Sequence, residues 1–567
     1  MVILGVSCWY HDAAAALVVD GKVVGAAAEE RFSRVKHDHS LPRRAIGWLL
    51  ADVGLDIGGV DLVTFYEKPL VKFERICASL VSTVPRSYRA GMAALPIWLR
   101  QKLWFPQVLR DEIGYRGPVH FSDHHLAHAA SAFLPSPFEE AAILTVDGVG
   151  EWATTTEGVG RGSSIALERE VRFPHSLGLF YSAVTAHLGF TVNNDEYKVM
   201  GLASYGQPRF RTEMEHLVHL HEDGSFELDL RYFAYHRGLR MLGRRGVALL
   251  GPRRRPESEI TERHCDLAAS LQLRLEEAML NLARAAHRRT GLRKLCMGGG
   301  VALNCVANGR ILTETPFDDV FVQPAAGDDG GAMGAALFSH CQTFGGPRAW
   351  RLEHAYLGPE HTDEEVEAVL REFGAPYREM SREELPAAAA RLVYANRIVG
   401  WFQGKMEWGP RALGARSILA NACNPAMKDI LNDRVKHRED FRPFAPVVPA
   451  EQMAEYFDLP VPSPYMLLIG SVRPDKRALI PSVTHTDGTA RPQSVRRDVN
   501  PLYYDVLRAF ERLSGVPVMI NTSFNVRGEP IVCSPGDAYR CFAGTGIDDL
   551  IIGRYWVRKE DLDGRHA

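Results

Sequence analysis

Short apolar runs separated by turn residues open the chain and predict β-strands. VILGVS at residues 2–7 and AAALVV at 14–19 are almost wholly apolar, and Asp20-Gly21 then marks a hairpin turn into KVVGAAA at 22–28. The same order of strand, acidic-glycine turn and strand returns in AAILTVDGVGE, WATTTEGVGRG and SSIALEREV. This second set echoes the pattern of the first without repeating its residues, so the sequence alone does not establish a duplication.

A long amphipathic stretch and two glycine clusters follow. Residues 264–291 carry leucines at helical spacing and basic residues near the end, which predicts a helix that stops at Gly291. Two glycine-rich turns follow, in KLCMGGGVALN and QPAAGDDGGAMGAA, and a short strand leads into the first of them. Strand, glycine turn and helix in succession favour an α/β domain that binds phosphate through backbone N–H groups. The candidate nucleotide-binding residues are Gly299, Gly300 and Asn304, and tightly packed glycines are the alternative.

A domain boundary is expected near residues 344–361, which are rich in Gly, Pro and charge. We expect one α/β domain over residues 1–350 and a second over 351–567. In the second, Asn500-Pro501 predicts a helix start, because Asn caps a helix well and Pro suits its first turn.

Composition narrows the possible environments and partners. With 46% hydrophobic and 24% charged residues the chain is typical of globular proteins, and its net charge of −3 gives no general reason to expect nucleic acid or an anionic membrane as a partner. No apolar run approaches membrane-spanning length, and the N-terminus lacks the basic region of a signal peptide. Nine scattered cysteines without a CxxC pair suit a reducing cytoplasm, with buried free thiols. We therefore expect a cytoplasmic protein without a membrane partner.

Two charged segments are predicted to be solvated. EERFSRVKHDH mixes acidic and basic residues, which is typical of an exposed face. Seven arginines lie between residues 237 and 255, and because no aromatic residues interleave with them, a solvated insertion is favoured over a nucleic-acid patch.

The stretch FSDHHLAHAASAF, residues 121–133, predicts a metal site. His124 and His128 are four apart and project to one face of a helix, close enough to bind one ion. An isolated pair of this spacing is more often a surface accident or a core pair. Here Asp147 ends an apolar strand and Asp328 lies in a glycine-rich turn, which adds two carboxylates. A mixed nitrogen and oxygen set favours iron(II), manganese or zinc. His125 is expected to be flanking structure, and Asp123 to cap the helix.

Further polar residues have two open interpretations. His11-Asp12, between the first two strands, is either a turn pair or a general base with its carboxylate partner. In the second half, loops bounded by Gly, Pro and Asn carry basic residues that suit a phosphate or carboxylate clamp but equally suit surface charge. These residues are Arg411, Arg416, Lys436, Arg438, Arg442 and Arg491.

Taken together, the chain resembles the NodU/CmcH family of O-carbamoyltransferases, which includes the tobramycin and cephamycin tailoring enzymes. The resemblance covers nearly the whole chain and rests on HDAAAALVVDG, EERFSRVKH, HHLAHAASAF, LTVDGVGEW, YKVMGLASYG, GGGVALN, GDDGGAMGAA, MEWGPRALGARSILA, VKHREDFRPFAP and NTSFNVRGEPIV. It implies an actin-like, two-lobed N-terminal domain and a YrdC-like C-terminal domain. It also implies a reaction in which carbamoyl phosphate and ATP give carbamoyl-adenylate and pyrophosphate, after which the carbamoyl group passes to an acceptor hydroxyl.

The resemblance also implies roles for particular residues. His124, His128 and Asp147 match metal ligands, most consistent with Fe(II), and Asp328 matches the fourth, although the adjacent Asp329 leaves that assignment open by one position. His11 matches the acceptor-side histidine, with Asp12 beside it. The residues that match the binding site for carbamoyl phosphate and ATP, the latter with Mg²⁺, are Lys36, Arg411, Arg416, Lys436, Arg442, Arg491 and Ser523.

Other functions remain open. A sugar kinase on the same actin-like fold would leave the second domain's basic cluster unexplained, and modest net charge with a fused second domain argues against tRNA threonylcarbamoylation. A non-catalytic nucleotide sensor would tolerate the loss of His11.

The expected acceptor is a natural product, such as a polyketide or a glycoside. Residues 77–105 are apolar and aromatic, and we expect a buried helical insertion there, with an acceptor-binding wall including Trp98 and Trp104 as the alternative.

Overall fold

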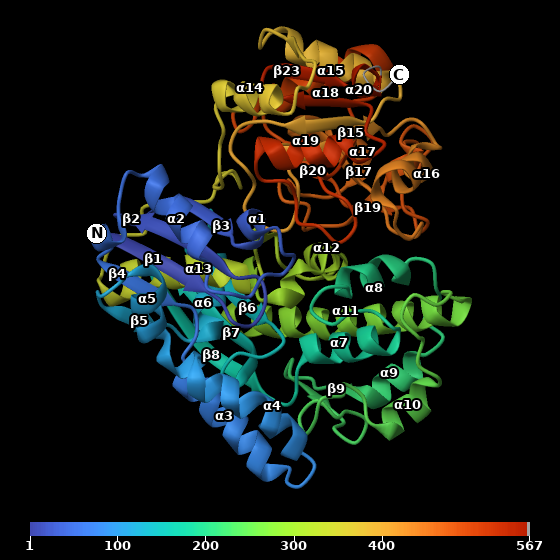
Figure 1. The fold of residues 1–567 in the computed structure, drawn as a ribbon. Helices are drawn as coiled ribbons and strands as arrows, with labels where there is room; N and C mark the ends of the chain where they lie inside the picture. Colours follow the sequence, from blue (N-terminus) through green and yellow to red (C-terminus); the bar gives the residue numbers. More distant parts are fainter. Residues whose placement is uncertain (564–567) are drawn as a thin grey trace. The chain divides into compact units, whose positions relative to one another are not determined.

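In the computed structural model, which describes residues 1–563, the chain forms two compact units. The first comprises residues 1–29 and 37–352, and the second comprises residues 30–36 together with the chain from residue 353 onward (Figure 1). The expected division between residues 350 and 351 left residues 30–36 in the first domain, whereas they pack with the second unit.

Two five-stranded sheets with the same topology form the first unit. Their strand orders are β3(Lys22–Ala28)-β2(Ala14–Val19)-β1(Val2–Ser7)-β4(Leu62–Phe65)-β5(Val119–Phe121) and β12(Asp319–Val322)-β11(Lys294–Gly298)-β6(Glu140–Val146)-β7(Ala153–Arg161)-β8(Ser164–Arg172). In each sheet the first strand is central, with an antiparallel hairpin on one side and two parallel strands on the other. The pattern echo in the sequence is therefore a duplicated topology, in agreement with the two-lobed, actin-like expectation.

The predicted elements of the first unit form for the reasons that the sequence indicated. The hairpin between β2 and β3 turns at Asp20 and Gly21, both with positive φ, of 48° and 79°. The amphipathic stretch forms α11(Glu262–Thr290), which ends at Gly291 in the left-handed conformation. The remaining helices are α2(Arg43–Asp52), α3(Pro69–Ser82), α4(Tyr88–Arg100), α5(Phe105–Ile113), α6(His124–Phe133), α7(Leu177–His187), α8(Glu196–Ala203), α9(Arg211–Leu217), α10(Arg244–Leu250), α12(Cys305–Glu314) and α13(Asp328–Phe338), and a short ribbon pairs β9(Val218–Leu220) with β10(Phe226–Leu228).

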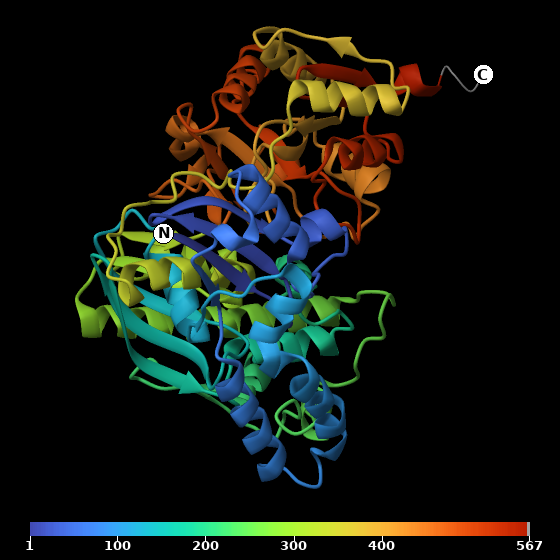
Figure 2. The ribbon, with the colours of Figure 1, turned by 60° about the vertical axis from the view of Figure 1, so that its left-hand side comes forward.

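Two helices pack closely between the sheets of the first unit. Helix α13 contacts β1 and β2, α6 contacts β6 and β11, and the two helices contact each other (Figure 2). Small residues allow this approach: a Cβ on Gly5 would lie 1.9 Å from the carbonyl oxygen of Ala332, and a Cβ on Gly334 only 2.0 Å from that of Ala127. Helices α6 and α13 are therefore fixed against one another by backbone contact.

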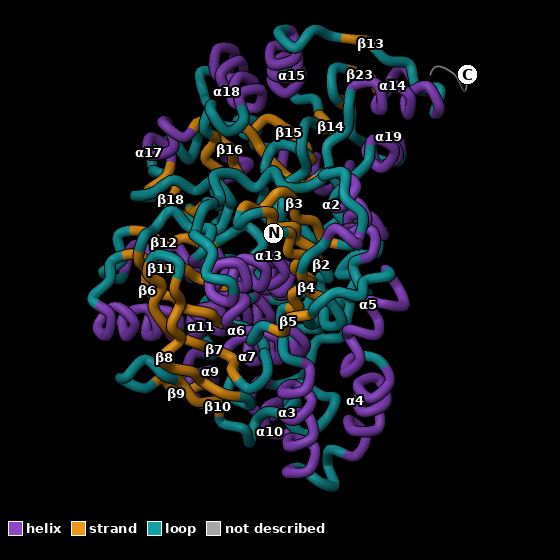
Figure 3. Tube along the Cα trace, turned by 90° about the vertical axis from the view of Figure 1, so that its left-hand side faces the viewer, coloured by secondary structure: helices purple, strands orange, loops and turns teal. Residues whose placement is uncertain are grey.

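Helices α3 and α4 form an antiparallel hairpin that extends away from the sheets of the first unit (Figure 3). Trp98 is buried and lies 5.9 Å from Phe73 between ring centroids, but several large apolar side chains of the hairpin are exposed, among them Val81 and Tyr88. The expectation of a buried insertion is therefore wrong, because only the inner faces of the two helices pack against each other and against the unit.

The arginine-rich segment is partly folded rather than wholly solvated. Arg254 is buried, with its guanidinium 5.0 Å from the ring centroid of Phe190, and the Nε of Arg253 donates a hydrogen bond to the carbonyl oxygen of Ala186 at 2.9 Å. Stacking on an aromatic ring and bonding to a helix carbonyl stabilise a guanidinium that leaves water.

An eight-stranded mixed sheet forms the core of the second unit. Its order is β13(Arg378–Glu379)-β23(Tyr555–Arg558)-β22(Asp549–Ile552)-β14(Val399–Phe402)-β15(Arg416–Asn421)-β21(Met519–Ser523)-β16(Ala445–Pro449)-β20(Gln493–Val495), and a small sheet has the order β17(Phe457–Asp458)-β18(Gly470–Val472)-β19(Thr489–Ala490). The helices are α1(Glu30–Ser33), α14(Asp363–Glu372), α15(Glu384–Tyr394), α16(Met427–Leu431), α17(Met453–Tyr456), α18(Pro501–Ser514), α19(Pro535–Ala543) and α20(Lys559–Asp563). As predicted, Asn500 caps α18 by accepting from the backbone N–H of Tyr503.

The mixed-charge segment of residues 30–36 is anchored in the second unit rather than solvated. Arg34 donates to the carbonyl oxygens of Ile531 and Pro530 at 2.7 and 2.9 Å, and the buried Arg31 donates to that of Gly409 at 2.9 Å. Phe32 packs against the apolar cluster of Met406, Ala412, Ile531 and Cys533. The second unit is thus completed by residues from near the start of the chain.

Two further sequence expectations concern membrane spans and cysteines. Within residues 1–563, no helix has both the length and the apolar character that crossing a bilayer requires. All nine cysteines are free thiols, as expected, but only six are buried, because Cys77, Cys265 and Cys423 are half-buried.

Candidate active site

The histidine pair lies at the start of α6 with its rings together. The Nε2 atoms of His124 and His128 are 3.0 Å apart, and both side chains are buried. Glu151 holds this end of the helix by accepting from the backbone N–H of His124 at 3.1 Å. Asp123 occupies the cap position but makes no capping hydrogen bond, and its carboxylate instead pairs with Lys68 at 2.8 Å. The expectation that Asp123 caps α6 is therefore wrong.

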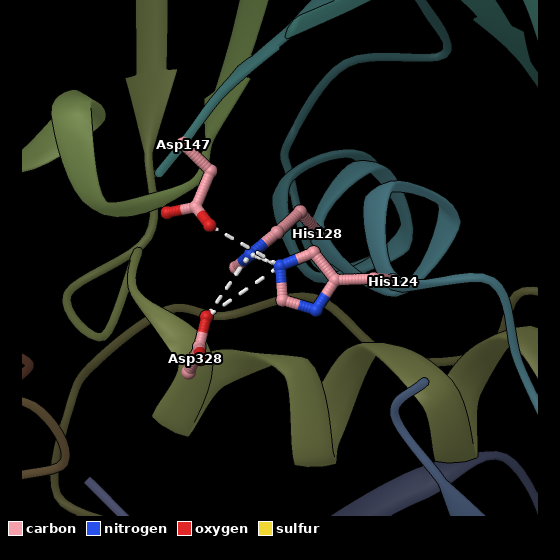
Figure 4. A group of neighbouring side chains, drawn as sticks. All are labelled: His124, His128, Asp147 and Asp328. Carbon is pink, nitrogen blue, oxygen red and sulfur yellow. Dashed lines mark hydrogen bonds and ion pairs between the residues drawn. The ribbon is translucent and has the colours of Figure 1, made fainter. Parts of the chain in front are cut away.

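Asp147 and Asp328 complete a compact cluster around the histidine pair (Figure 4). Asp147 follows β6 and places a carboxylate oxygen 3.3 Å from Nε2 of His124. Asp328 is the first residue of α13, and its Oδ1 lies 3.6 Å from Nε2 of His124 and 3.4 Å from that of His128. One potential ligand atom from each of the four residues lies within 4.8 Å of all the others.

The charges and donors of this cluster fit a divalent cation. Burial would raise the pKa of Asp147, but hydrogen bonding and charge from His124 and His128 lower it well below its usual range. Among residues 1–563, the buried Nδ1 atoms of both histidines and Oδ1 of Asp328 have no hydrogen-bond partner. Two buried carboxylates facing two imidazoles thus form a site in which positive charge is favoured, with the mixed nitrogen and oxygen donors that iron(II), manganese or zinc accept.

Asp329 lies outside the cluster although it is adjacent in the chain. Burial, followed by the charge of Asp12, raises the pKa of its carboxyl to about 7, and its Oδ1 accepts from the backbone N–H of Gly330 at 3.0 Å. Of the two neighbouring aspartates, the structure brings only Asp328 to the histidines.

His11 and Asp12 begin a chain of hydrogen bonds beside the cluster. Nδ1 of His11 lies 2.9 Å from Asp12, whose other oxygen lies 2.7 Å from Nδ1 of His37, and Nε2 of His37 lies 2.6 Å from Oδ1 of Asn194. Nε2 of His11 is 4.0 Å from Asp328. Asp12 has a positive φ of 51°, a conformation that is uncommon outside glycine and that tends to cluster at functional sites.

The neighbouring carboxylates control the protonation of His11. Burial would lower the pKa of His11, but Asp328 and Asp12 raise it to about 10. In turn, burial would raise the pKa of Asp12, and hydrogen bonds from His11 and His37 lower it. Sequence reasoning missed His37 and Asn194, because the partner of His37 is Asp12 and that of Asn194 is His37, both distant in the chain. The one signal was that His37 lies within the EERFSRVKH motif.

The glycine turn after β11 supports the cluster. Gly299 has a φ of +89°, and a Cβ there would lie 2.3 Å from the carbonyl oxygen of Val146. The backbone N–H of Gly300 donates to Oδ1 of Asp147 at 2.8 Å, which fixes that carboxylate.

Asn304 has a structural position. Its side-chain oxygen caps α12 by accepting from Ala307, and its amide pairs in both directions with Gln272 at 3.0 Å. The carbonyl and the amide of Asn304 are thus already bonded within the chain, so this residue fits a cap better than the expected nucleotide contact.

In the second unit, Lys436 and Ser523 lie together. The buried ammonium of Lys436 donates to Asn525 at 2.9 and 3.0 Å and lies 3.5 Å from the hydroxyl of Ser523. Burial, and then the charges of Arg438 and Arg442, lower the pKa of Lys436 well below its usual range. A buried ammonium whose charged form is disfavoured by its surroundings is typical of a site that binds an anion. Burial alone also lowers the pKa of a lysine.

Arg416 is placed differently from the other predicted clamp residues. Its side chain is fully buried, and its guanidinium donates to the carbonyl oxygens of Gln403, Gly404, Ala415 and Pro359 at 3.0 to 3.1 Å. It also lies over the ring of Phe402, 3.6 Å from the centroid. This geometry fits a residue that holds the loop rather than one that contacts carbamoyl phosphate.

The loop that carries Arg411 is held by buried polar side chains that the sequence reading did not single out. Glu407 accepts from the backbone N–H groups of Leu413 and Ala415 at 2.8 and 2.6 Å. Gln493 donates to Leu413 at 2.8 Å. The remaining candidates have half-buried side chains and lie on separate segments of the second unit; they are Lys36, Arg411, Arg442 and Arg491.

Comparison with protein families matches most of the chain. A family model described as carbamoyltransferase N-terminus matches residues 2–337, and one described as carbamoyltransferase C-terminus matches residues 390–559.

Relatives of similar length also align. An uncharacterized protein of Synechocystis is 46% identical over 98% of this chain and 96% of its own length. Nodulation protein NolNO of Sinorhizobium fredii is 39% identical over 97% of this chain and 79% of its own length. The 3'-hydroxymethylcephem-O-carbamoyltransferase of Amycolatopsis lactamdurans is 34% identical over 52% of this chain and 55% of its own. Among solved structures, HypF of T. kodakarensis aligns with a TM-score of 0.32 and 13% identity. The alignment covers 61% of this chain and 48% of the HypF chain, and a TM-score this low does not establish a shared fold.

Proposed function

The chain belongs to the carbamoyltransferase family of enzymes, and from this premise we propose that it is an ATP-dependent O-carbamoyltransferase acting on a small hydroxyl acceptor. Carbamoyl phosphate, ATP and one water molecule give carbamoyl-adenylate, pyrophosphate and phosphate, and the carbamoyl group then passes to the hydroxyl with release of AMP and a proton. The observation that carries this proposal is the buried cluster of His124, His128, Asp147 and Asp328 inside the region that matches the family's N-terminal model. The acceptor class is proposed by analogy with the cephem-modifying relative.

In the first unit, the cluster would hold one divalent metal ion, proposed to be Fe(II) with Mn or Zn as alternatives. A metal ion bound there supplies Lewis-acid stabilisation of negative charge on the adenylate phosphate. Gly300 fixes one ligand through its backbone N–H.

His11 is proposed to accept the proton of the acceptor hydroxyl, oriented by Asp12, which His37 orients in turn. With Asp328 charged, the pKa of His11 is about 10, so its ring is protonated at neutral pH. A cation held by Asp328 would offset part of the negative charge that raises the pKa of His11 and would thereby favour the neutral ring that a general base needs. A positioned general base contributes on the order of 10²–10⁴-fold to a rate.

The second unit is proposed to be the YrdC-like part that forms the adenylate. Lys436 and Ser523, with Arg411, Arg442, Arg491 and Lys36, would bind the phosphates of ATP and carbamoyl phosphate. Lys436 suits this role because an arriving phosphate favours the charged form of a buried ammonium.

The proposal is tested by pyrophosphate release from ATP with Mg²⁺, with and without carbamoyl phosphate, and with no acceptor present. We expect release that depends on carbamoyl phosphate. Formation of ADP and phosphate, indifferent to carbamoyl phosphate, would instead support a kinase and contradict the proposal.

The substitution His11→Gln tests the transfer step separately from the formation of the adenylate. We expect this variant to keep pyrophosphate release but to lose carbamoyl transfer to a panel of hydroxyl acceptors that includes 3'-hydroxymethylcephem, because only the second step needs a base. His39→Gln, at an exposed neighbouring position, serves as the control. Transfer that is unchanged in His11→Gln would exclude the base assignment, and the absence of any chemistry in the native protein would favour a nucleotide sensor.

A further inference from the structure

The α3–α4 hairpin carries an exposed apolar surface that the reaction does not explain. Val81 and Val84, at the turn, expose 75% and 71% of their surface, and Tyr88 and Met92 expose 70% and 63%. Tyr88 and Met92 are four apart in α4 and therefore share one stripe, which continues the apolar surface from the turn. Single exposed apolar residues need no explanation, but four large ones at one tip do.

The inner side of the hairpin is packed against the rest of the first unit. At its base, Lys72 pairs with Glu67, and the guanidinium of Arg75 lies 4.9 Å from the ring centroid of Phe173. Nearer the tip, the hydroxyl of Ser87 donates to Leu80 at 2.6 Å. The exposure of the tip is therefore not the result of a loosely packed segment, because the opposite side is packed and hydrogen-bonded.

Basic residues accompany the apolar tip. Arg86 and Arg89 are exposed and lie on either side of the start of α4, next to the apolar residues of the tip. The exposed acidic residue of the hairpin, Glu74, lies in the first half of α3, away from the turn. Apolar and aromatic side chains next to arginines suit the boundary between headgroups and acyl chains of an anionic bilayer.

We propose that this hairpin tip, defined as Val81, Val84, Arg86, Tyr88, Arg89 and Met92, docks reversibly on an anionic lipid surface. A second copy of the chain fits less well, because a two-fold contact would bring the arginines of one tip against those of the other. The helices have 14 and 13 residues, so they can lie at a bilayer surface but are too short to span it, which takes about 20 residues. The sequence alone predicts no membrane partner, because of the net charge of the whole chain and the lack of a membrane-spanning run. Neither property describes the local surface of one hairpin tip.

The test is sedimentation of the full chain with vesicles of equal parts phosphatidylcholine and phosphatidylglycerol, compared with vesicles of phosphatidylcholine alone. We expect binding to the anionic vesicles only, weakened by at least about 30-fold in the double variant Arg86→Glu/Arg89→Glu and weakened also by salt at about 0.5 M. Val81→Asp should lose binding, while Leu239→Asp, at a position of equal 75% exposure outside the hairpin, should not.

Three results would overturn the proposal. The first is no preference for anionic vesicles in the native protein. The second is binding that the tip variants leave unchanged while circular dichroism shows them folded. The third is a concentration-dependent dimer, seen by light scattering and lost in Val81→Asp, without vesicle binding. None of these readouts depends on carbamoyl transfer, so failure here is distinguishable from failure of the proposed function.

Discussion

At the residue scale, two adjacent aspartates at the start of α13 have opposite environments. Asp328 faces His124 and His128, whereas Asp329 points elsewhere and is bonded to its own helix. Burial acts to raise the pKa of both carboxyl groups, so desolvation alone does not distinguish a ligand from a neighbour. The direction in which the first turn of α13 points each side chain makes this distinction, and no residue pattern in the sequence encodes that direction.

This difference predicts the metal content of two matched variants. Asp328→Asn should weaken metal binding by at least about 100-fold, since loss of even an outer-sphere partner costs about 10–100-fold. Asp329→Asn, which is nearly isosteric, should bind as the native protein does. Metal per chain, measured by elemental analysis after equilibration with Fe(II), checks both. Loss in Asp329→Asn alone would contradict the cluster.

A second residue-scale prediction concerns pH. Burial, and then Arg263 and Arg253, lower the pKa of His187 to about 4 from an ordinary 6.5. Between these values the unfolded chain binds a proton that the folded chain does not, so stability falls as pH drops below about 6.5. From pH 7.5 to 5.5, His187 should remove about 1.4 kcal/mol of unfolding free energy. Urea unfolding should show a loss smaller by this amount in His187→Gln, and equal losses in both proteins would refute the assignment.

At the element scale, the site depends on how closely two helices approach. Helix α6 supplies both histidines and α13 supplies Asp328, and Gly334 lets the helices meet because it lacks a side chain. A Cβ there would lie 2.0 Å from the carbonyl oxygen of Ala127, a distance that requires the helices to separate. Helix propensity favours Ala over Gly, so any destabilisation by Ala must come from packing.

Gly334→Ala should therefore lower both stability and metal affinity, with a cost of about 1–3 kcal/mol from overpacking. The matched control is Gly47→Ala in α2, where a Cβ would have no atom within 4 Å, and it should be neutral or stabilise by up to about 1 kcal/mol. Thermal unfolding and metal titration measure the two effects. Equal behaviour of the two variants would show that the helices are not in the contact described.

At the scale of the whole molecule, the chain passes between the two units three times, at residues 29–30, 36–37 and 352–353. The short crossing segment brings Arg34 to the carbonyl oxygens of two buried residues of the second unit, Ile531 and Pro530. Unpaired buried acceptors are destabilising, so this segment is part of the second unit's fold rather than a linker.

Arg34→Ala should therefore lower the stability of the second unit by about 1–3 kcal/mol, because the carbonyl groups of Ile531 and Pro530 lose their donor. Arg43→Ala, which removes an exposed pair with Glu112, should change stability by less than about 1 kcal/mol. Calorimetry of the full chain measures both. An unchanged transition in Arg34→Ala would mean that the segment is dispensable for the second unit.

The sequence by itself determined the elements whose signals are local. The opening hairpin, helices α6, α11 and α18 and the strand before Asp147 follow from periodicity, turn residues and caps, which act over a few residues. The histidine pair and its candidate charge partners were also predictable, because spacing on one helix and a carboxylate at a strand end are local features.

Only the tertiary structure decided what depends on contacts between distant residues. These include the choice of Asp328 over Asp329, the pairing of Asp12 with His37, the burial of Arg416, the pairing of Asn304 with Gln272 and the exposure of the hairpin tip. Each outcome depends on whether residues far apart in the chain come into contact, and the free energy of burial or of an unmet hydrogen bond has no counterpart in a local pattern.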